Sequence, residues 1–172
     1  FCFAGSFLST QQFRHTVFSL LLYLELGKLS RAVMKMMETK EFTLKVENFS
    51  KRKETEIYSD IFLAAGYRWR IMVYPKGKRG IPGFLAAYVQ FVDWNTKPWG
   101  WTVPAIINLT LVDQLNGTSS VRDCSATNFH GNSDNSWGFN YLVSQTDLHD
   151  PQKGFLVDDT LLIEAVVSTV KY

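Results

Sequence analysis

Apolar and polar residues alternate in short runs from about residue 38 to the end of the chain, and turn-forming residues separate the runs. Residues 42–47 alternate with a period of two, which is typical of a strand with one buried face. Similar strand-like runs cover residues 57–65, 67–74, 84–92, 106–112, 121–129, 139–143 and 161–167. Several of the later runs are apolar on both faces, which favours two packed sheets over a single solvated sheet. The pattern therefore predicts an all-β sandwich of about eight strands, without a helix between them.

The first 37 residues follow a different pattern, rich in apolar and aromatic side chains. An uncharged run at residues 16–24 is followed by a group of basic residues. This run is shorter than the roughly 20 apolar residues that cross a bilayer, and a signal peptide carries its basic residues before the apolar run. We predict an N-terminal extension at residues 1–37, a domain at residues 38–172 and no membrane span. A helical or disordered extension, a membrane-contacting segment, and sequence upstream of a start at Met36 or Met37 all stay open.

The composition is that of a globular protein, with 46% hydrophobic and 15% aromatic residues and a net charge of +2. Lysine and arginine are interleaved with acidic residues, so the sequence lacks the basic patch typical of nucleic-acid-binding proteins. Cys2 and Cys124 occur without a C-x-x-C motif, which disfavours a disulfide framework and a zinc site. Interpreted as thiols in a reducing compartment, they indicate a cytoplasmic or nuclear protein. We expect no cofactor and no nucleic-acid partner.

The side chains that a hydrolase would use do not form a recognisable catalytic site. Cys124 lacks the helix N-terminus signal that accompanies an activated thiol, and the turn-rich stretches around His130 and His149 place neither imidazole against it. Asp158 and Asp159 are adjacent, and adjacent residues of a strand point to opposite faces. They are interpreted as turn or surface residues rather than as an acid–base pair. The sequence predicts no catalytic residue and no metal site.

The tetrapeptide at residues 136–139 combines a glycine with two aromatic residues. Gly138 is expected to let the backbone enter or leave a strand with an unusual dihedral angle. A tryptophan beside a glycine offers an extended peptide a large contact area at low entropic cost. The alternative, in which Trp137 and Phe139 fill the core, stays open from this local pattern.

The order of these features along the chain resembles that of the MATH (meprin and TRAF homology) domain family. The similar segments are residues 41–50, 58–62, 66–77, 84–91, 136–139, 150–159 and 161–167, so the resemblance covers about residues 40–170. The Gly-Tyr-x-Trp and Tyr-Pro-Lys-Gly segments resemble plant TRAF-like MATH proteins, and the closing third is similar to the MATH domain of ubiquitin-specific proteases. The resemblance implies an antiparallel, eight-stranded TRAF-like β-sandwich.

The resemblance also implies a function. Members of the family bind extended, often serine-containing peptides as an added strand beside a shallow groove. For this chain it implies a non-catalytic module that recruits partner proteins in ubiquitin-linked turnover or signalling, through ubiquitin-ligase or deubiquitinase machinery. The alternative is a substrate-targeting domain of a larger ubiquitin-specific cysteine protease of which this chain is a fragment. An oligomerisation domain is disfavoured, because residues 1–36 lack the sustained heptads of a coiled coil.

The resemblance assigns a candidate peptide-binding site position by position. Trp137 corresponds to the floor of the groove, and three further aromatic residues correspond to its walls. The full predicted set is Lys76, Tyr88, Phe129, Ser136, Trp137, Gly138, Phe139 and Asn140, with Lys76 as the basic residue that helps to hold a peptide serine. Ser136 departs from the family pattern, which has Asp at this position. Because a charge-assisted hydrogen bond is about twice as strong as a neutral one, we expect weaker or altered selectivity.

Overall fold

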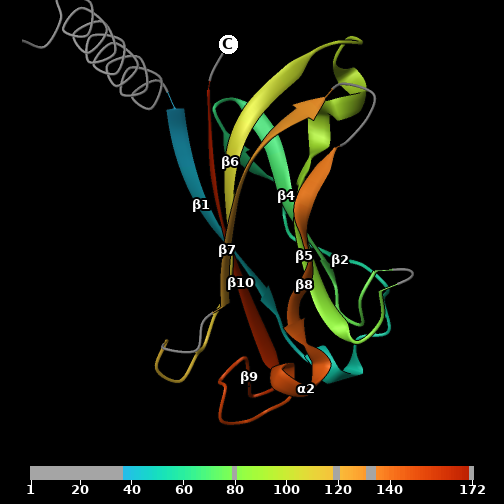
Figure 1. Ribbon diagram of the computed structural model, residues 1–172, viewed down its shortest axis with the longest axis vertical. Helices are drawn as coiled ribbons and strands as arrows, with labels where there is room; N and C mark the ends of the chain where they lie inside the picture. Colours follow the sequence, from blue (N-terminus) through green and yellow to red (C-terminus); the bar gives the residue numbers. More distant parts are fainter. Residues whose placement is uncertain (1–36, 79–80, 118–120, 131–134, 171–172) are drawn as a thin grey trace, which may run out of the picture. The chain divides into compact units, whose positions relative to one another are not determined.

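The computed structural model describes residues 37–78, 81–117, 121–130 and 135–170, and its strands form two sheets (Figure 1). The first sheet has the order β1 (Met37–Val46), β10 (Thr160–Val170), β6 (Thr102–Leu111) and β7 (Val121–His130), with β9 (Leu156–Val157) beside β10. The second has the order β2 (Ile57–Tyr58), β4 (Tyr67–Tyr74), β5 (Phe84–Phe91) and β8 (Ser136–Ser144), with β3 (Phe62–Ala64) beside β4. The predicted all-β antiparallel sandwich is confirmed.

The hydrophobic core lies between the two sheets, because strands of both contribute every second residue to it. In β10, Leu161, Ile163, Ala165 and Val167 are buried and the residues between them are not. The antiparallel register then sets Ile163 opposite Leu111 of β6. Strand β4 contributes Trp69, Ile71 and Val73 from the second sheet, each with no exposed surface. The period of two that was visible in the sequence thus places one face of each sheet in the core.

Aromatic rings pack together in the part of the core next to the β5–β6 connection. The Trp69 ring lies 5.2 Å from the Phe91 ring and 5.0 Å from the Phe129 ring, and the Trp69 indole N–H donates to the Ala64 carbonyl (3.3 Å). Trp101 stacks on Phe91 at 5.1 Å. Edge-to-face and stacked ring pairs add stability beyond the area they bury, so these rings join strands of both sheets.

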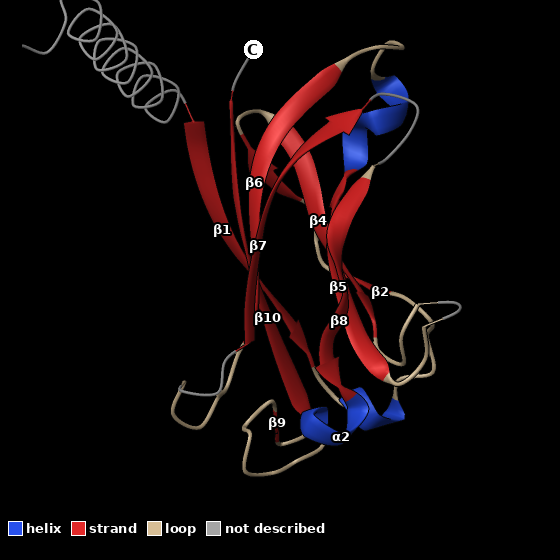
Figure 2. Ribbon diagram, in the orientation of Figure 1, coloured by secondary structure: helices blue, strands red, loops and turns tan. Residues whose placement is uncertain are grey.

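The described residues form ten strands where about eight were predicted, and the strands differ from the predicted pattern in several places. The run at residues 57–65 forms two short strands, β2 and β3, because Ser59 between them bonds to Ile71: its N–H donates to the Ile71 carbonyl and its hydroxyl accepts from the Ile71 N–H, both at 2.9 Å. Strand β6 begins at Thr102 rather than at residue 106, and the short strand β9 was not predicted. Short helical segments also occur between strands, at Phe49–Lys51, Val92–Thr96 and α2 (Gln145–Leu148) (Figure 2). The predicted extension at residues 1–37 lies outside the described residues except for Met37.

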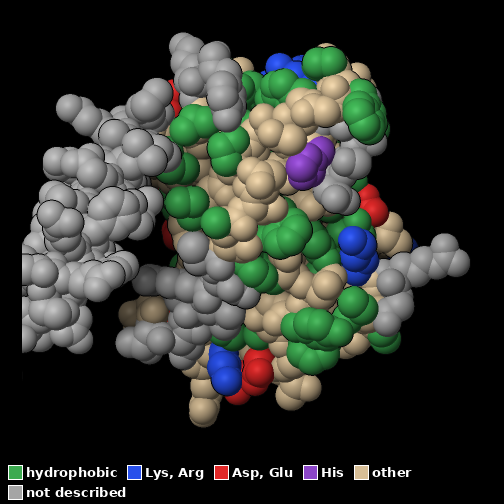
Figure 3. Space-filling view, turned by 45° about the horizontal axis from the view of Figure 1, so that its top comes forward, with side chains coloured by type: hydrophobic (Ala, Val, Ile, Leu, Met, Phe, Trp, Pro, Cys, Tyr) green, Lys and Arg blue, Asp and Glu red, His purple; other side chains and the backbone are tan. Residues whose placement is uncertain are grey.

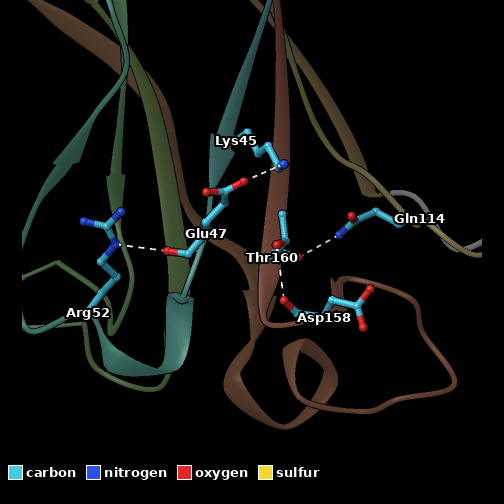
Figure 4. A network of polar contacts seen from close by, with 6 residues as sticks. All are labelled: Lys45, Glu47, Arg52, Gln114, Asp158 and Thr160. Atoms are coloured by element: carbon cyan, nitrogen blue, oxygen red, sulfur yellow. Dashed lines mark hydrogen bonds and ion pairs between the residues drawn. The ribbon is translucent and has the colours of Figure 1, made fainter.

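Asp158 and Asp159 form the tight turn between β9 and β10, which confirms their interpretation as turn residues. Both have a left-handed backbone, with φ of 49° and 55°. The Asp159 carboxylate accepts two bonds from Ser50, one from its N–H and one from its hydroxyl, each 2.8 Å long. Beyond the turn, the Gln114 amide donates to the Thr160 carbonyl at 2.8 Å (Figure 4). These bonds tie the turn and the start of β10 to the segments that follow β1 and β6.

Replacing Asp159 by asparagine should remove part of the pH dependence of stability. The bonds from the Ser50 N–H and hydroxyl lower the pKa of Asp159 below its ordinary value of 3.8. A carboxyl whose pKa is lower in the folded state stabilises the fold above its unfolded pKa, and this contribution is lost as the pH falls through the folded pKa. Asp159→Asn should therefore be less stable than wild type at pH 7, with a difference that shrinks in acid.

Urea unfolding of the full chain from pH 7 to about pH 2 measures this difference. Asp158→Asn is the matched control, because Asp158 has the same backbone conformation and makes no Ser50 bond. The explanation fails if Asp159→Asn and wild type lose stability in parallel on acidification.

Candidate functional site

Among the residues that the structure describes, strand β8 is the last strand of the second sheet and pairs with β5 on one side only. Its residues Ser136–Ser144 include no charged side chain. The first sheet ends in β1, which carries Glu38, Lys40, Glu41 and Lys45. Charged residues on an edge strand discourage pairing with another chain. Strand β8 therefore presents an open row of backbone donors and acceptors without this protection.

Trp137 lies at the open side of the sandwich and is 42% exposed. It pairs in register with Val89, whose side chain is in the core, so the indole starts from the inner side of the sheet. Its N–H donates to the Ser125 hydroxyl at 2.8 Å. Because Ser125 belongs to β7, the edge strand of the other sheet, Trp137 bridges the two sheet edges. Phe139 is half-buried and packs against the core. Of the two aromatic residues of the motif, Trp137 is therefore partly exposed and Phe139 contributes to the core.

Gly138 allows a close backbone approach between β8 and β5. A side-chain Cβ at this position would lie 2.1 Å from the Ala87 carbonyl oxygen and 2.5 Å from the Tyr88 Cα. The expected unusual dihedral is wrong: φ of Gly138 lies outside the left-handed region, and the residue sits within β8 rather than at its end. The need for glycine is steric, as it often is in a strand that another backbone approaches closely. The register shifts just beyond this point, between Leu85 and Ala87 of β5.

Tyr88 projects from the outer face of the second sheet, the face turned away from the core. It is 5% exposed and forms a small buried cluster with Met72 and Ala86, against which Tyr74 packs. Its hydroxyl donates to the Asn140 side-chain oxygen on β8, and burial raises the pKa of Tyr88. The predicted groove residues Tyr88 and Asn140 are thus in direct contact.

A lysine that the sequence did not indicate lies on Tyr88. The Lys78 ammonium is 4.9 Å from the centre of the Tyr88 ring, within the range of a cation–π interaction. The predicted Lys76 is exposed in the same β4–β5 connection, with no ion pair to any residue that the structure describes. The sequence places both lysines in one loop and holds no signal that separates them.

Ser136 is half-buried and stands opposite Gln90 of β5. The Gln90 side-chain oxygen accepts a bond of 2.6 Å from the Arg70 Nε, and the Arg70 guanidinium lies 4.0 Å from the centre of the Tyr58 ring. The alternation of β4 could have indicated Arg70, since residues 68, 70, 72 and 74 must share the face opposite to the core. Arg70, Gln90 and Ser136 therefore form one row across the outer face.

Tyrosine hydroxyls also contact an acidic side chain, Glu56. Tyr58 donates to the Glu56 carboxylate. Burial and a hydrogen bond to Glu56 raise the pKa of Tyr74 to about 12, so its hydroxyl remains a donor at neutral pH. The Glu56 carboxylate therefore accepts hydrogen bonds from these two hydroxyls.

The groove role predicted for Phe129 is wrong. Phe129 is 1% exposed and packs against Trp69 and Phe91 in the core. Its partner in the β6–β7 register is Val103, which is also buried. Because residues that pair in register lie on the same face of a sheet, the register of β7 turns Phe129 inward and leaves it no surface for a peptide.

The side chains considered for catalysis are placed as follows. Cys124 lies in β7 opposite Asn108, and His130 ends the same strand. The His149 Nδ1 lies 2.8 Å from the Gln145 carbonyl oxygen at the end of α2. Within the described part of the chain, no three His, Cys, Asp or Glu side chains are grouped to bind a metal.

No helix in that part is long and apolar enough to cross a membrane. The face in Figure 3 carries several separate groups of exposed hydrophobic side chains and few charged ones.

Comparison with known proteins adds to this geometry. The chain matches the MATH domain family over residues 41–167. It is 35% identical over 133 residues to Ubiquitin C-terminal hydrolase 12 of Arabidopsis thaliana, an alignment that covers 77% of this chain and 12% of that protein. It is 32% identical over 131 residues to the MATH domain and coiled-coil domain-containing protein At3g58210 of the same plant, covering 76% of this chain and 39% of that protein. The chain thus spans well under half the length of these relatives.

A solved structure shows the same fold. TRAF5 of Notothenia coriiceps superimposes with a TM-score of 0.58 at 18% sequence identity, over 96% of this chain and 93% of that chain.

Proposed function

Because this chain belongs to the MATH domain family, a family of protein-interaction modules found in TRAF proteins and ubiquitin-specific proteases, we propose that it binds short extended segments of partner proteins along β8. The observation that carries the proposal is the open, uncharged edge of β8 with a half-exposed Trp137 upon it. A peptide would pair with this edge as an added strand, in the mode known as β-augmentation.

Such a peptide would meet two different surfaces. Backbone bonds to β8 supply affinity, and side chains that point alternately to either side supply selectivity. On the inner side, the peptide would lie against Trp137. On the outer side, it would meet Ser136, Gly138 and the Tyr88–Asn140 pair. Ser136 and Asn140 both offer hydroxyl or amide groups, which suits a peptide that contains serine. Because a short segment must be ordered on binding, we expect micromolar affinity, about −8 kcal/mol.

We also propose that the bound partners belong to ubiquitin-linked turnover or signalling, in the cytoplasm or nucleus. Support comes from the relative named Ubiquitin C-terminal hydrolase 12, which contains a segment 35% identical to this chain. The same likeness favours a second possibility, in which this chain is the targeting domain of a larger ubiquitin-specific cysteine protease. The complete coding sequence distinguishes the two: catalytic Cys and His boxes would identify a protease, and a BTB segment would identify a ubiquitin-ligase adaptor.

An array of short peptides, probed with the full chain and with Trp137→Ala, tests the binding edge. We expect the wild-type protein to bind peptides that share a motif. The Trp137→Ala protein should bind that motif at least about tenfold more weakly, because an exposed aromatic anchor of this kind is a common hot spot. Trp137→Phe keeps the ring and loses the bond to Ser125, so it should retain most of the affinity.

Trp99→Ala is the matched control, because Trp99 is 88% exposed and lies in the β5–β6 connection, outside β8. It should bind the motif as wild type does. Thermal unfolding confirms that each variant is folded. The β8 proposal is overturned if folded Trp137→Ala protein still binds the motif with wild-type affinity. It is also overturned if Trp99→Ala weakens binding as much as Trp137→Ala does.

A further inference from the structure

We infer that the peptide bound along β8 carries an anionic side chain at the outward-facing position beside Gly138, where Lys78 meets it. This inference rests on the proposed function and specifies its ligand. It depends on the charges of the outer face, on the placement of Lys78 and on the open space beside Gly138.

The outer face of the second sheet carries more positive than negative groups that are free to meet a ligand. Arg68 is neutralised by Asp93, whose carboxylate lies 2.6 Å from its Nε. Arg70 and Lys78 have no acidic partner among the described residues; each lies on a tyrosine ring instead. Glu56 keeps its negative charge but accepts hydrogen bonds from tyrosine hydroxyls, and it forms no ion pair with Arg70 or Lys78 within the described part of the chain. An anionic ligand group would therefore find cations without ion-pair partners.

Lys78 is positioned beside the binding edge before any ligand arrives. Its ammonium rests on the ring of Tyr88, and the hydroxyl of Tyr88 is bonded to Asn140 of β8. The ring contact holds the cation and leaves its remaining surface exposed to solvent. An ion pair with a cation that is already held loses less side-chain entropy than a pair between two mobile side chains.

The geometry of an added strand brings a ligand side chain within reach. Neighbouring strands lie about 4.8 Å apart, so a peptide beside β8 would be about 10 Å from β5 and Tyr88. Between them stands Gly138, in register with Tyr88 and without a side chain. An outward-pointing Asp, Glu or phosphoserine of the peptide could extend across Gly138 toward the Lys78 ammonium. No acidic residue of β8 competes for that ammonium.

The test uses libraries of short peptides whose central residue is fixed as Ala, Lys, Asp, Glu or phosphoserine, with the other positions randomised. Wild type should prefer the anionic libraries over Ala by about two- to fivefold, as one exposed ion pair provides. Lys78→Met keeps an apolar side chain of similar length over Tyr88 and should abolish the preference. Lys78→Glu should reverse it in favour of Lys. The Asp, Glu and phosphoserine libraries distinguish a carboxylate from a phosphate.

Lys40→Glu is the control for net charge, because Lys40 is exposed on β1, the edge strand of the other sheet. It should keep the wild-type preference, and added salt should reduce that preference in both proteins. Equal binding of the Ala and anionic libraries by wild type overturns the inference, as does a preference that survives in both Lys78 variants. If peptides bind in a Trp137-dependent way without anionic preference, only this inference fails. If no library binds, the proposed function fails with it.

Discussion

Gly138→Ala will separate β8 from β5 and abolish peptide binding. The new Cβ would lie 2.1 Å from the Ala87 carbonyl oxygen and 2.5 Å from the Tyr88 Cα. Both are backbone atoms of the neighbouring strand, so no side-chain rotation relieves the contact. The strand must move, and overpacking of this kind costs about 1–3 kcal/mol. We expect a loss near the upper end of that range, together with loss of the hydrogen-bonded edge to which a peptide would add.

Chemical denaturation measures the loss of stability, and hydrogen exchange measures the separation of β8 from β5. The amides of β8 and β5 should lose protection more than those of the first sheet. Gly100→Ala is the matched control: a Cβ there meets nothing within 4 Å, but φ is +81°. Its cost should be about 1 kcal/mol from backbone conformation alone, and binding should persist. The steric explanation is refuted if Gly138→Ala is no less stable than Gly100→Ala and still binds peptide.

Phe129→Ala will destabilise the protein strongly without acting on the binding edge directly. The ring is 1% exposed and packs against Trp69 and Phe91. Removing a buried phenylalanine side chain costs about 3–5 kcal/mol, through lost transfer energy and the cavity left behind. This is a large part of the 5–15 kcal/mol that stabilises a typical domain. Urea unfolding should show the loss, accompanied by a lower yield of folded protein.

Phe129→Leu makes the same position testable for binding. Leucine fills more of the site than alanine, so enough folded protein should remain for an affinity measurement. The affinity of the folded protein for the array motif should match that of wild type, whereas Trp137→Ala should show the opposite pattern, with a small loss of stability and a large loss of affinity. A tenfold loss of affinity in folded Phe129→Leu would return Phe129 to the peptide site.

Alternation along the chain was enough to predict the sandwich, because each buried strand face has to be apolar at every second residue. The motif order added the MATH resemblance, which the family match over residues 41–167 confirms. The division at Ser59 was not predictable, since it depends on bonds between Ser59 and Ile71, a residue of another strand. Strand β9 has two residues and exists only through its pairing with β10. So short a segment has no periodicity to detect.

The candidate site shows the same limit at the level of single residues. The sequence singles out Trp137 and Phe139 as a pair, but which of the two is exposed depends on how β8 packs against β7 and the core. The resemblance assigned Phe129 to the groove by its position in the sequence, and sequence position does not determine the register of β7 on β6. The register decides which face a residue occupies. The sequence does not indicate that Lys78, rather than Lys76, lies on Tyr88, because the path of a loop over a sheet cannot be read from its composition.

The absence of charged side chains on β8 has a consequence for the protein's behaviour at high concentration. An edge that accepts a peptide strand accepts the same edge of another copy by the same backbone bonds. If β8 binds peptides as proposed, partner segments and second copies would compete for one row of donors and acceptors. By mass action, a saturating concentration of the proposed partner would then keep the domain monomeric, and removal of that partner would favour self-association.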